Sequence, residues 1–277
     1  MTGFAMAGGD VPYLHHAETG SRAPHGFFGA AGGVSSGVYA SLNCGFGSDD
    51  ETRLVAANRD RVAGAMGLAT DRLAAVYQVH GADAVIAISG AAADRSQMTR
   101  ADGMVTTQTG LGLSILTADC LPLLLVDEAA GVIGACPAGW REAVAGIVGA
   151  TLALMRDQGA GPVTALIGPT IRQPSYQVGA EMRETCLASI DPAIREAAAC
   201  CFLAEDGGRF RFDLPGLVRH QLAHAEVAEI LDCGQDTYAG MPEGGASDSP
   251  GFFSHRRATH AAEPDCGRQI SVIALAG

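Results

Sequence analysis

Three short apolar runs follow one another in the middle of the chain, and they constrain the fold more than any other feature. They span residues 112–117, 121–126 and 131–136, and only brief turns separate them. Apolar runs of this length between turns are typical of buried strands. From Gly139 to Met155 the apolar residues recur every three or four positions, which predicts a helix. A core built from both strands and helices is therefore expected.

The rest of the chain continues this mixture of elements. Asp49 or Asp50 is expected to cap one helix, and Asp213 followed by Pro215 to open another. A segment rich in Gly, Pro and Ser at 240–251 predicts a mobile loop. No repeat or linker is visible, so residues 1–277 are expected to form a single domain of the α/β (α+β) class. Further helices are expected over 51–66, 180–189, 192–199 and 214–225, and further strands over 74–79, 84–88, 102–106, 163–168, 209–212, 227–231 and 269–275.

Composition excludes several classes of protein. Of the 277 residues 48% are hydrophobic, enough for a substantial core, and the net charge of -12 disfavours nucleic acid and anionic membrane surfaces as partners. All 18 basic residues are Arg, which excludes Schiff-base chemistry and the P-loop lysine. A phosphate would be bound by Arg, backbone N–H groups or hydroxyls.

Nothing in the sequence indicates a membrane span or a secretory signal. The longest uncharged helical stretch, residues 143–155, is too short to cross a bilayer, and residues 1–10 lack a basic start and a long apolar run. The 8 Cys residues form no C-x-x-C pair. A cytoplasmic location is expected, and the sequence specifies no oligomeric state.

A candidate active site lies at the ends of the central strands. Cys120 stands beside Asp119 after an apolar strand, His80 ends an earlier one, and Trp140 and Arg141 occupy a strand-to-helix junction, where backbone amides often bind anions. A thiol, an imidazole and a guanidinium can therefore meet at one sheet edge. Each has a structural alternative, because a lone His is more often only hydrogen-bonded, an Asp beside a turn is often a cap, and Arg141 can equally form a salt bridge.

Two further residues are candidates for substrate binding. Asn43 follows a segment rich in Gly and Ser at 26–37, and Arg59 lies on the helix expected over 51–66. Asn43 can hydrogen-bond a ligand, and Arg59 can bind a phosphate or carboxylate if its face of the helix turns inward. The structural alternatives are that the glycines serve tight turns and that Arg59 is solvated.

Taken together, these motifs resemble the YfiH family, the former DUF152 group that is also labelled laccase-like multicopper polyphenol oxidase and peptidoglycan editing factor. The resemblance covers nearly the whole chain. The matching segments are residues 33–37, 41–43, 58–59, 78–81, 117–122, 138–141, 168–169, 176–179, 213–215, 252–254, 256–257 and 267–268.

The resemblance implies a fold of mixed sheets sandwiched by helices, related to the catalytic domain of cytotoxic necrotizing factors. It also implies a His-Cys-His metal site that contains His80 and Cys120, with zinc as the usual metal and copper for the reported phenol oxidation. The activities implied are purine nucleoside phosphorolysis and adenosine deamination. A small-molecule nucleoside and phosphate would then be the partners, with Asn43, Arg59 and Gln78 binding substrate.

The sequence departs from the family pattern at two positions. The His expected before Ala-Gly-Trp-Arg is Pro137, and the Gly expected after it is Glu142. Proline offers no donor atom, so two of three metal ligands remain. His255 is the better candidate for a replacement ligand and His260 the second. A natural loss of metal, a replaced ligand and a substitution confined to this sequence are the three interpretations.

Several mechanisms remain open at this stage. Zinc-bound hydroxide held by His80 and Cys120 would suit deamination, with Asp119 orienting a ligand or moving a proton. In phosphorolysis, Arg141 and Arg59 would bind phosphate and Asn43 the ribose or base. The alternatives are a metal-free Cys-His hydrolase acting on a peptidoglycan precursor, a copper-dependent phenol oxidase, and a non-catalytic binding protein, for which Pro137 is the best support.

Overall fold

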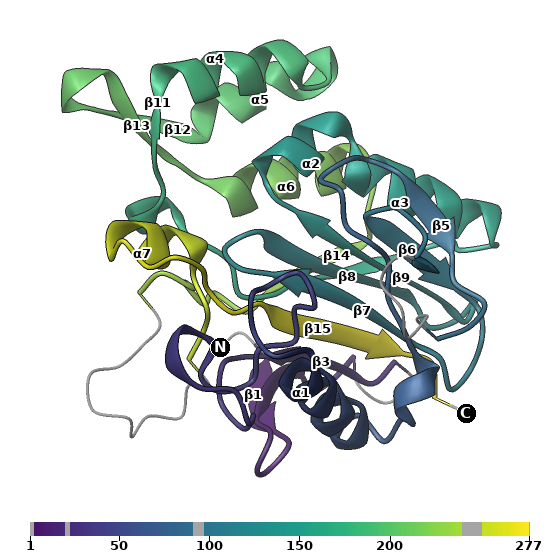
Figure 1. The fold of residues 1–277 in the computed structure, drawn as a ribbon. Helices are drawn as coiled ribbons and strands as arrows, with labels where there is room; N and C mark the ends of the chain where they lie inside the picture. The colour runs from purple at the N-terminus through teal and green to yellow at the C-terminus, as the bar shows by residue number, and fades with distance from the viewer. Residues whose placement is uncertain (1–2, 20–22, 91–96, 240–250, 277) are drawn as a thin grey trace.

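Two six-stranded sheets lie face to face, and helices cover their outer faces (Figure 1). The computed structural model describes residues 3–19, 23–90, 97–239 and 251–276. In the first sheet the order is β1 (Phe4–Ala7), β2 (Tyr13–His16), β3 (His25–Phe28), β15 (Gln269–Ala274), β7 (Gly112–Thr117) and β4 (Leu73–Ala74). In the second sheet the order is β14 (Glu229–Asp232), β10 (Thr164–Ile167), β8 (Leu121–Asp127), β9 (Val132–Ala138), β6 (Gly103–Thr106) and β5 (Ala84–Ile86).

The helices divide between the two outer faces. Helix α1 (Thr52–Ala65) covers the first sheet, and α2 (Trp140–Ala145), α3 (Ile147–Asp157) and α6 (Leu214–His224) cover the second (Figure 1). A three-stranded sheet, β11 (Gln177–Gly179), β13 (Arg209–Phe212) and β12 (Phe202–Glu205), packs with α4 (Ala180–Ser189) and α5 (Arg195–Cys200). The last helix, α7 (His255–His260), precedes β15.

Strand β8 shows how the sequence fills both sides of its sheet. Leu121, Leu123 and Leu125 belong to the core under the helices, whereas Leu124 and Val126 belong to the core between the two sheets. The side-chain period of a strand is two, so a continuous apolar run is what a strand buried on both faces requires. The mixed α/β class with helices outside the sheets is confirmed.

Most of the predicted elements are present, with bounds shifted by a few residues. The run at 112–117 is β7, and the helix predicted over 180–189 is α4, both with the predicted bounds. The long helix after Gly139 is divided, because Gly146 adopts a φ of 98° and separates α2 from α3. The loop predicted over 240–251 lies, apart from Gly251, outside the described residues.

The helix caps agree with the sequence only in part. Asp213 caps α6 as predicted, with its carboxylate accepting from the N–H of Gly216 at 2.9 Å. The prediction that Asp49 or Asp50 caps α1 is wrong, because Glu51 holds that position and makes no side-chain cap bond. Asp50 instead accepts a hydrogen bond from the Ser35 hydroxyl at 2.7 Å, so its carboxylate binds a neighbouring loop.

None of the described helices is both long enough and apolar enough to cross a bilayer.

Candidate functional site

A cavity of about 590 Å³ lies where several strand ends and loops meet. Its size falls within the roughly 300–1,000 Å³ of typical small-molecule sites. Its walls come from the turn between β7 and β8, the junction of β9 with α2, the segment before β5 and the start of α7. The lining includes most of the predicted site residues, namely Arg59, Gln78, His80, Asp119, Cys120 and Arg141, together with Trp140, Glu142, Tyr176, His255, Arg256 and Arg268.

A buried aspartate fixes the backbone that carries His80. The carboxylate of Asp102, which is 0% exposed, accepts from the N–H groups of Val79 at 3.0 Å, His80 at 3.0 Å and Gly81 at 2.7 Å. His80 itself has a φ of 59°, a conformation that most residues adopt only under constraint. Asp102 therefore positions His80. The sequence did not predict this role, because Asp102 was interpreted only as the first residue of a strand.

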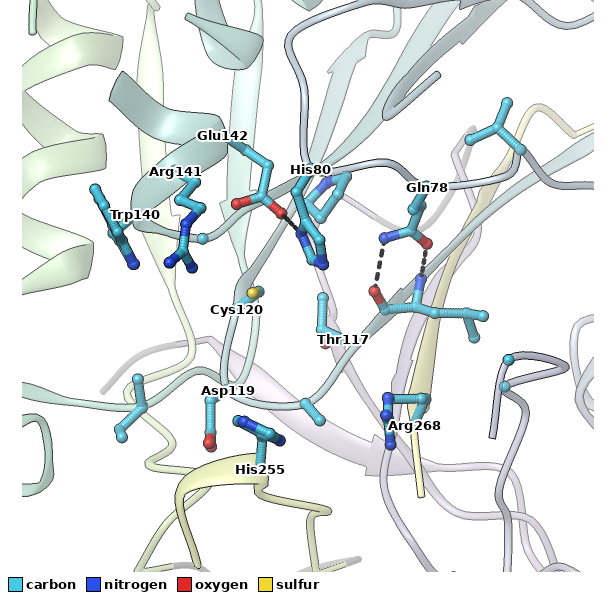
Figure 2. Close-up of a pocket in the computed structure, with 18 of the residues that line it drawn as sticks. Gln78, His80, Thr117, Asp119, Cys120, Trp140, Arg141, Glu142, His255 and Arg268 are labelled. Carbon is cyan, nitrogen blue, oxygen red and sulfur yellow. Dashed lines mark hydrogen bonds and ion pairs between the residues drawn. The ribbon is translucent and has the colours of Figure 1, made fainter. Parts of the chain in front are cut away.

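Glu142 holds the ring of His80. The Glu142 carboxylate, 2% exposed, bonds Nδ1 of His80, whose side chain is 64% exposed (Figure 2). This hydrogen bond raises the pKa of His80; burial opposes the rise and the carboxylate charge adds to it. The sequence analysis noted Glu142 only as a departure from the family pattern. Its contact with His80, which is 62 positions away in the chain, could not be predicted.

Cys120 is kept as a thiol by its surroundings. Burial raises its pKa, and the negative charges of Glu142 and Asp119 raise it further. Its sulfur lies against Gly139, where a Cβ would be 2.6 Å from Cys120 Sγ and also 2.6 Å from Glu142 Oε2. Only glycine allows both groups to approach this point of the backbone. Cys120 and Glu142 are therefore neighbours on one wall of the cavity.

The carboxylate of Asp119 connects three separate segments. One oxygen accepts from the Thr237 hydroxyl at 2.6 Å, and the other accepts from the Ser254 hydroxyl at 3.0 Å and the Arg256 N–H at 2.7 Å. Asp119 has a φ of 81°, and its carbonyl accepts from the Thr170 hydroxyl at 2.8 Å. Both carboxylate oxygens are thus bonded within the protein, which makes Asp119 a positioning residue for the cavity floor.

Two of the predicted substrate-binding residues have their polar atoms bonded within the protein. The side-chain amide of Gln78 donates to the carbonyl of Leu116 and accepts from the N–H of Leu116, both at 2.9 Å (Figure 2). These two bonds connect the segment between β4 and β5 to β7. Asn43 is 0% exposed and is not part of the cavity lining. Its side-chain oxygen accepts from the N–H groups of Gly45 at 3.1 Å and Arg268 at 2.9 Å. Asn43 therefore shapes the loop beside the cavity.

Arginines supply positive charge on several sides of the cavity. The guanidinium of Arg141 lies 4.6 Å from the centre of the Trp140 ring and faces Cys120 (Figure 2). Arg141 forms no salt bridge with any of the described residues. Arg59 is buried, and its guanidinium donates to the carbonyl of Cys44 and the hydroxyl of Ser114, both at 3.3 Å.

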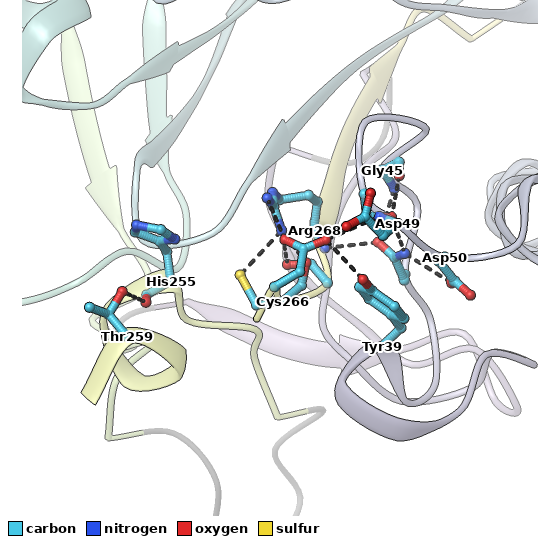
Figure 3. Close-up of polar contacts among 12 residues, drawn as sticks. Tyr39, Gly45, Asp49, Asp50, His255, Thr259, Cys266 and Arg268 are labelled. Atoms are coloured by element: carbon cyan, nitrogen blue, oxygen red, sulfur yellow. Dashed lines mark hydrogen bonds and ion pairs between the residues drawn. The ribbon is translucent and has the colours of Figure 1, made fainter. Parts of the chain in front are cut away.

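A third arginine on the opposite wall is restrained by an acidic partner. Arg268 pairs with Asp265 at 3.1 Å and contacts the sulfur of Cys266 at 3.2 Å (Figure 3). The hydroxyl of Tyr39 donates to the same Asp265 carboxylate at 3.0 Å. This network fixes the wall that Arg268 contributes.

The side chains around Pro137 do not fit a metal site. Pro137 lines the cavity without a donor atom, and Nδ1 of His80 is bonded to Glu142. Cys136 points into the core under the helices, as its strand position predicts. No group of three or more His, Cys, Asp or Glu side chains in the described parts of the chain is arranged to hold a metal ion, so His255, although it lines the cavity, does not complete such a group.

His260, the second candidate for a replacement ligand, is occupied elsewhere. Its Nδ1 lies 2.9 Å from the hydroxyl of Tyr238, and the residue is not part of the cavity lining. The donor set of this cavity therefore supports neither the zinc nor the copper expected from the resemblance.

The sequence is similar to a group of bacterial proteins along almost its whole length. The profile of the family described as "Multi-copper polyphenol oxidoreductase laccase" matches residues 24–276. A purine nucleoside phosphorylase of Deinococcus radiodurans is 37% identical over 254 residues, which cover 91% of this chain and 89% of that protein. The Escherichia coli protein named purine nucleoside phosphorylase YfiH is 31% identical over 244 residues, covering 88% of this chain and 90% of that protein.

Solved structures share the fold. The crystal structure of YlmD from Geobacillus stearothermophilus superimposes with a TM-score of 0.84 at 28% identity, covering 96% of this chain and 96% of that chain. Neisseria meningitidis protein NMB0706, assigned to DUF152, superimposes with a TM-score of 0.77 at 28% identity, covering 99% of this chain and 100% of that chain.

Proposed function

The chain belongs to the multi-copper polyphenol oxidoreductase laccase family, the group also known as DUF152 or YfiH, and on that basis we propose that it is a purine nucleoside phosphorylase. In this reaction a phosphate oxygen attacks C1′ of the nucleoside and the bond from C1′ to the purine nitrogen breaks. The base leaves with the bonding electron pair and gains a proton. Relatives that match most of the chain carry this name, which supports the proposal.

The observation that carries the proposal is the positive lining of the cavity in an acidic protein. The net charge is -12, yet Arg59, Arg141, Arg256 and Arg268 all line this cavity. Its two lining carboxylates are already bonded to other groups of the protein. A guanidinium without an acidic partner can bind a phosphate through two parallel hydrogen bonds. We assign this task to Arg141, which stands at the start of α2 and faces the cavity.

His80 is placed to serve the departing base. Its ring is held at Nδ1 by Glu142, and the rest of the imidazole is exposed on the cavity side. A positioned histidine can deliver the proton that the purine gains when the glycosidic bond breaks. Trp140 and Tyr176 also line the cavity and offer aromatic surface for the base.

The other activities considered have less support. Adenosine deamination and phenol oxidation were both expected to use a metal, and the donor set around Pro137 does not fit one, so no step through a metal is derived for this chain. A Cys-His hydrolase needs a thiolate, whereas burial and two nearby carboxylates raise the pKa of Cys120.

The test is direct measurement of phosphorolysis. Purified protein is incubated with inosine, guanosine or adenosine, with and without phosphate, and free base and ribose 1-phosphate are quantified. We expect phosphate-dependent release of both products. Arg141→Ala should raise the KM for phosphate by about 10- to 100-fold, because a charge-assisted contact is lost. Arg53→Ala, on the exposed side of α1, is the control and should leave the KM unchanged. Equal product without phosphate would indicate a hydrolase, and no product would favour a binding protein.

A further inference from the structure

Glu142 is buried in a place where a carboxylate needs a specific partner. It is 2% exposed in the first turn of α2, and its carboxylate points toward His80 (Figure 2). An ionised carboxylate that loses water without a compensating hydrogen bond is strongly unfavourable. The hydrogen bond to His80 Nδ1 provides that compensation. The contact between the two residues is therefore part of the folded structure and not a chance surface contact.

His80 is restrained on both its backbone and its ring. Asp102 binds three successive N–H groups around it, and Glu142 binds the ring. When Nδ1 carries the hydrogen that Glu142 accepts, Nε2 is the ring nitrogen that remains for a ligand in the cavity. No hydrogen bond to Nε2 is present among the described residues. The pair therefore fixes both the orientation of the imidazole and the nitrogen that faces the substrate.

The same carboxylate also lies beside Cys120. Cys120 Sγ and Glu142 Oε2 both approach the Cα of Gly139 so closely that a Cβ there would stand 2.6 Å from each. The Glu142 carboxylate thus binds His80 and lies near Cys120, but these three side chains are not arranged to hold a metal ion. Pro137, on the neighbouring strand end, contributes no donor to this group.

We propose that Glu142 is a positioning residue that holds His80 in place of a metal ion, so that this site works without bound metal. The two departures from the family pattern are then linked: Pro137 removes a metal ligand, and Glu142 supplies the group that fixes His80. This inference extends the proposed function. Only its kinetic test depends on phosphorolysis being the activity of the chain.

NMR of the imidazole tests the contact itself. In protein labelled with ¹⁵N at histidine, long-range spectra distinguish Nδ1 from Nε2, and His80→Asn identifies the signals of His80. We expect a proton on Nδ1 whose signal shifts in Glu142→Gln. Glu196→Gln is the matched control, because Glu196 is also in the first turn of a six-residue helix but is exposed, and it should leave the signal unchanged. An unchanged His80 signal in Glu142→Gln would overturn the proposal.

Metal content and kinetics complete the test. After incubation with zinc and desalting, the wild-type chain should retain none, while Pro137→His combined with Glu142→Gly serves as the zinc-binding reference. Stoichiometric zinc in the wild-type chain would overturn the proposal.

Glu142→Gln should lower kcat by about 10- to 100-fold with little change in KM, as expected for loss of an orienting partner. Failure of the wild-type chain to phosphorolyse nucleosides would reject the proposed function, whereas the NMR and zinc results decide this inference independently.

Discussion

Replacing Asp119 by Asn should weaken the folded state by an amount that the structure allows us to estimate. The carboxylate accepts three hydrogen bonds, from the hydroxyls of Thr237 and Ser254 and the N–H of Arg256. An asparagine keeps one oxygen and presents an NH₂ group in place of the other, so at least one buried donor loses its acceptor. Such a loss costs about 1–3 kcal/mol. Asn tolerates a positive φ, so the backbone adds no strain.

The assay uses the single tryptophan of the chain. Trp140 lines the same cavity, and its fluorescence can follow unfolding in urea. We expect the unfolding free energy of Asp119→Asn to fall by about 1–3 kcal/mol, which for a chain of this size corresponds to a Tm lowered by roughly 2–5 °C in a thermal scan. The control is Asp157→Asn at the exposed end of α3, which should change the unfolding free energy by less than about 0.5 kcal/mol.

The result that would refute this reasoning is normal stability combined with lost turnover. Asp119 would then act on the substrate, as the sequence had suggested, and its three bonds would not be its main contribution. Reduced stability with activity that recovers at lower temperature would agree with a positioning role.

Three further predictions follow from other contacts. Cys120→Ala should lower turnover, because it removes the side chain that packs against Gly139 beside the Glu142 carboxylate, whereas Cys200→Ala, at an exposed position, should leave it nearly unchanged; equal loss in both would contradict this packing role for Cys120. Arg172 holds the pKa of Asp232 below its usual 3.8 although burial acts to raise it, so this pair should stabilise the protein above about pH 4 and lose that effect as the pH falls through the lowered pKa. Asp232→Asn should therefore destabilise the protein most at neutral pH, and the difference from the wild type should shrink as the pH falls below about 4, as followed by urea unfolding across a pH series. Gly139→Ala should reduce activity at least tenfold, measured beside circular dichroism to verify folding, because its Cβ would displace the sulfur and carboxylate that approach this glycine.

The central sheet was predictable because its signal is local. Strands β7 and β8 are continuous apolar runs between turns, and burial on both faces preserves that pattern in the sequence. Strands β1 and β2 lie at one side of the first sheet; β1 has no buried residue, and two of the four residues of β2 are His, which is why the sequence did not reveal them. The break at Gly146 was also missed, because a glycine within helical spacing does not reveal its φ.

The site was predictable in its location but not in its connections. Cys120, His80 and Arg141 do line one cavity, as their positions at strand ends suggested. The role of Glu142 depends on the fold bringing residue 80 next to residue 142, and an acidic residue in a helical first turn has an ordinary local explanation. Asn43 was predicted to bind substrate because it is a polar residue in a glycine-rich loop, and the sequence could not reveal that its side-chain oxygen bonds Gly45 and Arg268.

The position of β15 also determines when the first sheet can be completed. This strand is nearly the last segment of the chain, yet it lies between β3 and β7, whose residues precede it by more than 150 positions. Until it is inserted, two strand edges with unpaired N–H and C=O groups remain open on either side of the gap. Contacts of such large sequence separation form slowly, and open edges favour pairing with other chains. A folding intermediate that lacks β15 therefore exposes two open strand edges, and insertion of this strand is the step that closes the first sheet.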